Sequence, residues 1–356
     1  MMRALLLLES GQHYEGEGAG AERLVTGEAV FFTGMTGYEE ALTDPSYNAQ
    51  ILVFTYPMIG NYGISRSAMQ HGTTCAAGAV VKRLCRHPSH HQSKLDLDAW
   101  MKEQGMPAIV GVDTRALTMH LREHGTMRAV LATGDAAIAS APDALRAYCA
   151  AAPANLVAPV SIPAPMQRGT RGAHKRLVLI DCGLKEGILQ ALGELDVSVT
   201  VLPWNATRAE ILAQRPDAIL ISNGPGDPQD LPEIVATLRS FIGELPLFGI
   251  CLGHQLLASA CGAKTFKLPY GHRGGNQPVK DLETGRVLVT AHNHGYAVDR
   301  TTFPGELVET MVNLNDDTNE GFRHRTLPIA AVQFHPEASP GPADARYLFE
   351  RWLASV

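Results

Sequence analysis

Pro246-Leu247-Phe248-Gly249-Ile250-Cys251-Leu252-Gly253-His254-Gln255 joins one apolar run to another through a Gly-x-Cys-x-Gly turn. The pattern predicts a β-strand that ends in a sharp bend, followed directly by a helix. Cys251 would then lie at a helix N-terminus, where backbone N–H groups and the helix dipole favour the thiolate. The flanking glycines relieve the steric crowding of the bend. The sequence therefore predicts that Cys251 is a nucleophile.

The second half of the chain alternates between apolar strand-like runs and helix-like segments. We expect strands over residues 177–180, 197–202, 218–222 and 247–250, and helices over residues 187–195, 208–214, 233–242 and 254–260. This alternation is typical of the α/β class. We therefore predict a C-terminal doubly wound, mostly parallel sheet that carries the nucleophile elbow.

The first half of the chain reads as a smaller mixed α/β domain. We expect strands over residues 27–32 and 50–54 and helices over residues 96–104 and 114–124. Between Pro142 and Arg176 the composition shifts to Ala, Pro and small polar residues, and proline removes backbone donors. We therefore predict an N-terminal domain over 1–150, a linker over 151–175 and a C-terminal domain over 176–356.

Composition excludes several classes of protein. A chain of 356 residues with 45% hydrophobic content is long enough for two domains, each with its own core. The 30 Lys and Arg against 36 Asp and Glu are spread along the chain, so neither nucleic acid nor a membrane surface is an expected partner. The 6 cysteines show no disulfide framework, which favours a cytoplasmic location.

Polar segments follow three of the expected strands, and the carboxyl ends of parallel strands form sites in open α/β sheets. Asn223-Gly224-Pro225-Gly226-Asp227 follows one strand, Cys251 the next, and His335-Pro336-Glu337 a third. We expect a Cys-His-Glu triad, in which His335 takes the thiol proton and later returns it to a leaving amine. Glu337 would orient the imidazole of His335 and favour its charged form.

The glycine loop supplies donors for a developing oxyanion. Since proline has no N–H, the loop donor must come from Gly224 or Gly226, and the residue after the nucleophile, Leu252, supplies the second. We assign Gly224 and Leu252 as the oxyanion hole. A phosphate cradle is the alternative, but the loop lacks both Gly-x-Gly-x-x-Gly and the Lys-Ser/Thr ending of a phosphate loop.

Two other groups of residues have competing interpretations. His254 follows Cys251 closely but lies in the body of the expected helix, so we favour a structural role over that of the base. Cys85-Arg86-His87-Pro88-Ser89-His90-His91 contains possible zinc ligands, but its spacing matches no common four-ligand pattern and favours a solvated loop. We expect no metal site and no cofactor in this chain.

Three motifs in the second half resemble those of class I, triad-type glutamine amidotransferases. They are the elbow around Cys251, the loop Ser222-Asn223-Gly224-Pro225-Gly226-Asp227, and His335-Pro336-Glu337. The resemblance implies hydrolysis of the glutamine side-chain amide to glutamate and ammonia through a thioester.

The first half resembles the N-terminal domain of carbamoyl-phosphate synthetase small chains. The segments that carry this are 33–40, 42–47, 55–63 and 112–115, with later matches over 271–276, 293–296 and 337–342. The resemblance implies a heterodimer, or a higher assembly of heterodimers, with a large chain that combines the ammonia with bicarbonate, ATP and Mg²⁺. The product would enter arginine or pyrimidine biosynthesis.

The same resemblance implies a set of residues that bind L-glutamine. They are Gly34, Gly224, Gly226, Leu252, Gln255, Asn293, Gly295 and Tyr296. Gly34 stands where several members of the family have Ser, so only a backbone contact is expected at that position. Backbone groups and two amide side chains suit the zwitterionic α-carbon of the substrate.

Two alternative functions follow from the residues. One is another glutamine amidotransferase, such as an anthranilate or guanylate type, and Met35-Thr36-Gly37-Tyr38 in the first half counts against it. The other is a catalytically silent scaffold that only positions a partner chain. Intact Cys251, His335 and Glu337 count against silence.

Overall fold

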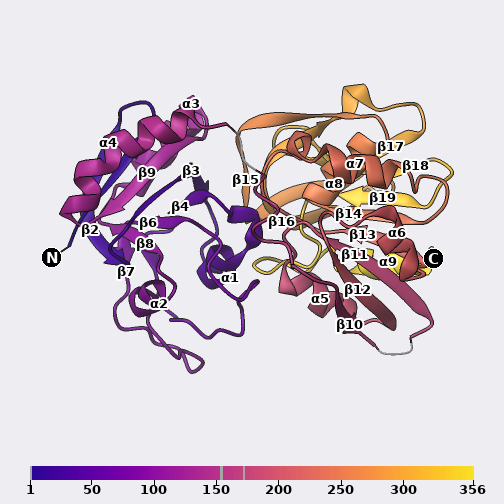
Figure 1. Ribbon diagram of the computed structural model, residues 1–356, viewed down its shortest axis with the longest axis horizontal. Helices are drawn as coiled ribbons and strands as arrows, with labels where there is room; N and C mark the ends of the chain where they lie inside the picture. Colours follow the sequence, from indigo (N-terminus) through magenta and orange to yellow (C-terminus); the bar gives the residue numbers. More distant parts are fainter. Residues whose placement is uncertain (1, 153–154, 171–172) are drawn as a thin grey trace. The chain divides into compact units, whose positions relative to one another are not determined.

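The computed structural model describes residues 2–152, 155–170 and 173–356. The chain divides into two compact units, Met1–Pro153 and Ala154–Val356 (Figure 1). Each unit has its own hydrophobic core, built in the first around Trp100 and Phe54, and in the second on both faces of a sheet.

The first unit is a closed barrel of seven strands. In spatial order the strands are β1 (Arg3–Leu8), β2 (His13–Gly20), β8 (Pro107–Val110), β6 (Gly78–Val81), β4 (Gln50–Phe54), β3 (Leu24–Phe32) and β9 (Met127–Thr133). A short pair, β5 (Met58–Ile59) and β7 (Arg83–Leu84), lies outside the barrel. The helices of the first unit are α1 (Tyr38–Thr43), α2 (Leu97–Glu103), α3 (Thr114–His124) and α4 (Asp135–Ala150).

Helix α3 shows how local signals set an element in this unit. Asp113 caps its start, because its carboxylate accepts the N–H of Ala116 at 3.1 Å. Leu117 and Leu121, four residues apart, are both fully buried. Gly125 ends the helix with a φ of 90°, which a residue with a side chain rarely adopts.

Over its described residues, the second unit forms a sheet of ten strands. In spatial order they are β10 (Met166–Gly169), β12 (Val197–Pro203), β11 (Lys175–Asp181), β13 (Ala218–Ile221), β14 (Leu247–Ile250), β19 (Ile329–Val332), β18 (Asn319–His324), β17 (Leu307–Asn313), β15 (Lys264–Asp281) and β16 (Val287–Asp299). Strands β12, β11, β13, β14 and β19 are parallel. Antiparallel pairs extend the sheet on both sides.

Helices cover both faces of the parallel strands. Residues of α6 (Arg208–Ala213), α7 (Pro232–Arg239) and α8 (Leu252–Ala260) pack on one face with Val178 and Ile180. Residues of α5 (Glu186–Gly193) and α9 (Tyr347–Ala354) pack on the other with the alternate residues Leu177 and Leu179. Figure 1 shows α5 across the strands from α7 and α8. Alternate side chains of a strand point to opposite faces, so the apolar run of β11 fits a doubly wound sheet, as predicted.

The predicted linker over 151–175 is wrong in part. Met166–Gly169 forms strand β10, which pairs antiparallel with β12 at the edge of the sheet. Val157 is 1% exposed and packs into the core of the second unit. The carboxylate of Asp181 accepts the N–H of Ile162 at 2.7 Å, which satisfies backbone in this proline-rich stretch. Residues 153–154 and 171–172 of the prediction lie outside the described residues.

The compositional shift that begins at Pro142 also misled the sequence interpretation. Helix α4 continues through Pro142 to Ala150. Ala141 and Leu145 are buried on this helix, and they pack with Val130 and Ala132 of β9. Tertiary burial therefore outweighs the helix-breaking tendency of one internal proline.

Candidate active site

Cys251 lies at a sharp turn between β14 and α8. Its φ of 55° and ψ of −105° lie outside the conformations that residues with side chains usually adopt, at a cost of about 1–3 kcal/mol. The Cys251 N–H donates to Val332 O at 2.9 Å, and this bond ties the turn to the end of β19. Cys251 is 1% exposed. The predicted nucleophile elbow is present, and its strain is held by neighbouring strands.

The two glycines of the elbow are required by close approach of backbone. A Cβ on Gly249 would lie 2.5 Å from Gly253 O, and a Cβ on Gly253 would lie 2.3 Å from Ile221 O. Both distances are too short for any side chain. The Gly-x-Cys-x-Gly pattern thus permits α8 to start directly against β13 and β14.

The expected oxyanion loop packs against the elbow. The N–H of Gly253 donates to Ser222 O at 3.1 Å, which fixes the end of β13 to the first turn of α8. A Cβ on Gly224 would lie 2.0 Å from Cys182 O, so the backbone at Gly224 runs too close to Cys182 for any side chain. Leu252 is the first residue of α8, where helix N–H groups have no intrahelical partner. The same Cβ on Gly224 would lie 2.9 Å from Leu252 Cδ2, so the loop lies against the residue that follows Cys251.

His335 and Glu337 follow β19 and form a buried pair. His335 Nδ1 lies 2.7 Å from Glu337 Oε1, and the side chains of both residues are almost fully buried. The His335 N–H donates to Ala291 O at 2.9 Å, which fixes the backbone of the histidine to β16. An ionised carboxylate can only accept, so Nδ1 carries the proton and Nε2 keeps a lone pair. Nε2 is buried and has no hydrogen-bond partner among the described residues, as a base for the thiol requires.

Sequence reasoning missed Lys185, which precedes α5 and completes this group. Its Nζ lies 2.9 Å from Glu337 Oε1 and donates to Ala338 O at 2.7 Å. Burial by itself raises the pKa of Glu337, but the charge of Lys185 and the contacts with His335 outweigh it and lower this pKa to about 2. Glu337 therefore stays ionised. Lys185 follows β11, so the strand-end rule that selected Cys251 and His335 also applies to it.

Comparison with known proteins identifies the family. Residues 178–354 match the family model described as glutamine amidotransferase class-I, and residues 6–131 match carbamoyl-phosphate synthase small chain, CPSase domain. A carbamoyl phosphate synthase small chain from Streptococcus pyogenes serotype M3 is 47% identical over 360 residues, covering 100% of this chain and 98% of the relative. Another from Bacillus caldolyticus is 48% identical over 356 residues, with 100% and 97% covered. The chain belongs to the carbamoyl phosphate synthase small chain family.

Membership of the small-chain family confirms the resemblance read from both halves of the sequence. The match over residues 6–131 lies in the first unit and the match over residues 178–354 lies in the second. The predicted amidotransferase fold class of the second unit is confirmed as well. Of the helices in the described part of the chain, none has both the length and the apolar character needed to cross a membrane.

Hydrogen bonds link several of the expected glutamine-binding residues of this small-chain family member to Cys251 and to its helix α8. The Cys251 thiol donates to Asn293 O at 3.6 Å. Gln255 Nε2 donates to Tyr296 O at 2.8 Å, which joins α8 to β16. Gly295 lies between these two strand positions, and Gly226 lies in the oxyanion loop with a φ of 92°.

Gly34 is the one expected glutamine-binding residue that lies in the first unit, after β3. A Cβ there would lie 2.4 Å from Cζ of Phe32. The Phe32 ring therefore occupies the space into which a serine side chain would project. Glycine at this position follows from the packing of its own unit.

His254 lies in the core and its surroundings fit a structural role. It is fully buried, and its Nε2 lies 3.0 Å from Asn319 Oδ1. Burial lowers the pKa of His254 to about 4, so the ring is neutral at physiological pH. In the loop that begins at Cys85, by contrast, His87, His90 and His91 are exposed, as a solvated loop requires.

Proposed function

We propose that this chain is the glutaminase subunit of a carbamoyl phosphate synthase. It hydrolyses L-glutamine to glutamate and ammonia, and a large chain combines the ammonia with bicarbonate and ATP, with Mg²⁺, to make carbamoyl phosphate. The observation that carries this proposal is the buried His335, held at Nδ1 by an ionised Glu337 and open at Nε2. Family membership supports the partner and the substrate.

The reaction begins when His335 Nε2 accepts the proton of the Cys251 thiol. The sulfur attacks the side-chain amide carbon of glutamine, and the carbonyl oxygen becomes an oxyanion beside the N–H groups of Gly224 and Leu252. Collapse of this intermediate breaks the C–N bond, and the His335 imidazolium gives its proton to the leaving nitrogen, which departs as ammonia. A thioester remains on Cys251.

Hydrolysis of the thioester reverses the same proton transfers. His335 takes a proton from water, the resulting hydroxide attacks the thioester carbon, and the sulfur leaves and recovers the proton as a thiol. Glutamate is released and the enzyme returns to its starting state. Glu337 stays ionised throughout and favours the imidazolium that forms twice in each cycle.

The setting of this activity follows from the same family. We propose a heterodimer with the large chain, alone or in a higher assembly, and a product that feeds arginine or pyrimidine biosynthesis. The 6 cysteines are free of disulfides, which suits a reducing compartment, and we place the protein in the cytoplasm.

The test separates glutamine hydrolysis from synthesis. With the large chain present, we expect Cys251→Ser to lower glutamine-dependent carbamoyl phosphate synthesis by at least about 10³-fold, because the nucleophile is lost. Synthesis from added ammonia should be unchanged. Cys261→Ser is the matched control, because Cys261 follows the other end of α8 and should retain both activities. Glutamine use retained by Cys251→Ser would refute the nucleophile, and failure of the chain to bind any large chain would refute the partner.

A further inference from the structure

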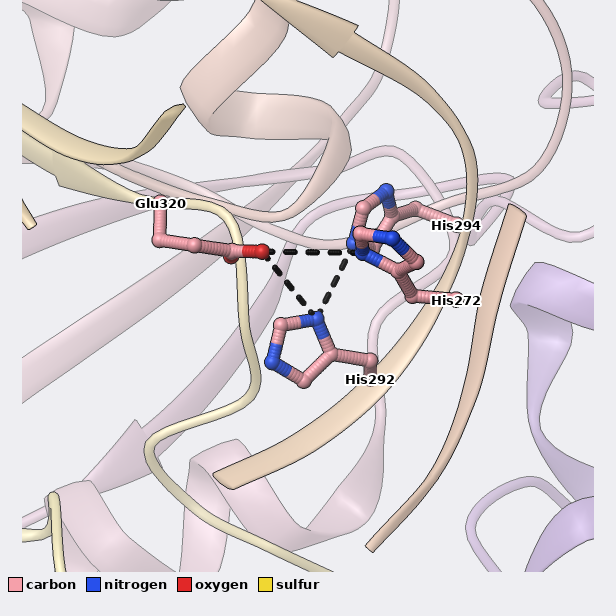
Figure 2. Close-up of side chains that lie close together, drawn as sticks. All are labelled: His272, His292, His294 and Glu320. Atoms are coloured by element: carbon pink, nitrogen blue, oxygen red, sulfur yellow. Dashed lines mark hydrogen bonds and ion pairs between the residues drawn. The ribbon is translucent and has the colours of Figure 1, made fainter. Parts of the chain in front are cut away.

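Four buried side chains on three strands lie close together (Figure 2). His272 comes from β15, His292 and His294 from β16, and Glu320 from β18. One potential ligand atom of each lies within 4.8 Å of those of the other three. The antiparallel register places His272 directly opposite His294, which brings the strands' imidazoles together.

The spacing of these atoms suits a small cation. His292 Nδ1 lies 3.0 Å from His294 Nε2, and Glu320 Oε1 lies 3.6 Å from both His272 Nδ1 and His292 Nδ1. Ligands about 2.0–2.1 Å from a tetrahedral zinc ion are separated from one another by roughly 3.3 Å. The four atoms therefore need only small shifts to surround one ion.

The outer nitrogens of two imidazoles are fixed as donors. His294 Nδ1 lies 2.9 Å from Tyr296 O, which can only accept, so Nδ1 carries the proton. His272 Nε2 lies 2.7 Å from Asp316 Oδ2, a carboxylate that likewise can only accept. The inner nitrogens, Nε2 of His294 and Nδ1 of His272, are then available as ligands. A metal-bound histidine usually donates its other N–H to a carbonyl or carboxylate in this way.

A single hydroxyl hydrogen decides the orientation of the third imidazole. Thr290 Oγ1 donates to Gln277 O at 2.9 Å and also lies 2.8 Å from His292 Nε2. Since a hydroxyl has one hydrogen, Thr290 must accept from His292, and Nε2 carries the proton. The inner Nδ1 of His292 is then a lone pair that faces the lone pair of His294 Nε2 at 3.0 Å.

Glu320 adds a buried carboxylate to these lone pairs. Its Oε1 accepts from Asn313 Nδ2 at 3.0 Å, which orients the group. Its Oε2 is buried and has no hydrogen-bond partner among the described residues. Buried carboxylate oxygens are normally paired, so the site holds more acceptors than the surrounding donors satisfy.

We propose that His272, His292, His294 and Glu320 bind one zinc ion. Three imidazoles and a carboxylate suit zinc and related transition metals, whereas Mg²⁺ and Ca²⁺ prefer oxygen ligands. All four positions are filled by protein, as in structural sites, whereas catalytic zinc keeps an open position. We predicted no metal site from the sequence, where only His292 and His294 stand close together and His272 and Glu320 belong to other strands.

The zinc ion would stabilise the strand that positions the catalytic residues. His292 and His294 flank Asn293, whose carbonyl oxygen accepts a hydrogen bond from the Cys251 thiol. On the other side of His292, Ala291 O accepts the backbone N–H of His335. A zinc ion bound to His292 and His294 would fix this part of β16, and with it the contacts that β16 makes to Cys251 and to His335.

The binding experiment uses the full chain. The protein is stripped with dipicolinate, dialysed, and titrated with Zn²⁺ against a chromophoric chelator. We expect one tightly bound zinc per chain, a rise in Tm on addition of zinc, and a tetrahedral Co²⁺ spectrum. His292→Gln should weaken zinc binding by at least about 100-fold. A glutamine amide at this position can donate to the lone pair of His294 Nε2, so the variant should keep the fold, which circular dichroism checks.

Control variants locate the ion. Cys251→Ser should keep the zinc, which excludes binding by the catalytic thiol. His120→Ala/His124→Ala, which removes a stacked pair on α3 formed by the half-buried His120 and the exposed His124, should keep it as well. Asp316→Asn, a change in a partly exposed loop side chain, should weaken zinc binding by about 10–100-fold through His272.

Three results would overturn the proposal. They are the absence of stoichiometric zinc in the folded wild-type chain, equal zinc affinity in the wild type and a folded His292→Gln or Asp316→Asn variant, and an octahedral Co²⁺ spectrum. In the first case a proton shared by His272 and Glu320 would hold the cluster together in place of the metal.

Discussion

Glu337 keeps its charge in the interior because a buried cation lies beside it. Lys185 Nζ contacts the same oxygen that accepts from His335, and the side chains of Lys185 and Glu337 are 2% and 0% exposed. Removing charges from water costs free energy that a buried pair only partly recovers, so such a pair is weak evidence for net stability. Its value here is positional, because the fixed anion accepts from Nδ1 of His335 and leaves Nε2 outside that hydrogen bond.

Replacement of Lys185 by methionine tests this arrangement. We expect Lys185→Met to lower the free energy of unfolding by about 3–5 kcal/mol, because it leaves a buried carboxylate without its cation. Burial then raises the pKa of Glu337, so the carboxylate loses its charge, and with it its orienting contact to His335, at a higher pH than in the wild type. The acid limb of the glutaminase pH profile should therefore move to higher pH. Urea denaturation and a pH series of kcat/KM measure the two effects.

A matched exposed pair provides the control. Arg176 and Asp217 form an ion pair with side chains 46% and 34% exposed. Arg176→Met should cost less than about 1 kcal/mol, because solvent screens surface pairs. An equal loss in the free energy of unfolding for Lys185→Met and Arg176→Met would contradict the prediction, because it would mean that burial does not change the energetic cost of removing the cation.

At the scale of elements, the elbow depends on how closely α8 approaches the strands beneath it. Gly253 N–H donates to Ser222 O, while the Cα of Gly253 faces Ile221 O with no room for a methyl group. The strained turn at Cys251 is thus held by contacts from β13 and β19 rather than by its own residues. The helix and strands must be packed before the thiol is in place.

Alanine substitution tests whether Gly253 is required by close packing, unlike a helical glycine with open space around it. We expect Gly253→Ala to destabilise the protein by about 1–3 kcal/mol, because the new methyl group overpacks against β13. It should also lower kcat, since α8 must shift away from the loop. Gly193→Ala in α5 is the control: a Cβ there meets nothing within 4 Å, and alanine favours helix. Thermal unfolding should show a lower Tm for Gly253→Ala and an unchanged or higher Tm for Gly193→Ala.

At the scale of the whole molecule, each unit carries a complete core. Trp100 is fully buried in the first unit, while Trp204 and Trp352 pack in the cores of the second. Domains with their own cores generally fold as units. The three tryptophans therefore report on the two units separately.

Fluorescence of tryptophan variants can follow each unit by itself. In Trp204→Phe/Trp352→Phe protein, which retains Trp100, Leu52→Ala should lower the urea midpoint, because it opens a cavity costing about 2–5 kcal/mol in the first core. In Trp100→Phe protein the same substitution should leave the midpoint unchanged. Leu256→Ala, in a core of the second unit, should have the reverse effect. Equal shifts at both probes would mean that the units unfold as one.

Much of this protein can be read from local sequence. Helix and strand periodicity predicted the elements of the parallel sheet, because burial on a repeating surface leaves a repeating pattern. The glycines around Cys251 predicted the elbow, because close backbone approach excludes side chains. The strand-end rule predicted that Cys251 and His335 lie at one edge of the sheet, and the Cys251 N–H does donate to Val332 O at the end of β19.

Only the tertiary structure decided what depends on distant pairing. Lys185 meets Glu337 because β11 and β19 belong to one sheet. The four ligands around His292 meet because antiparallel strands extend that sheet with a particular register. The linker prediction was wrong over residues 166–169 for the same reason, since these residues pair with β12 as the edge strand β10. Local patterns record which face of an element is buried, whereas the identity of the group across the interface depends on how elements pack.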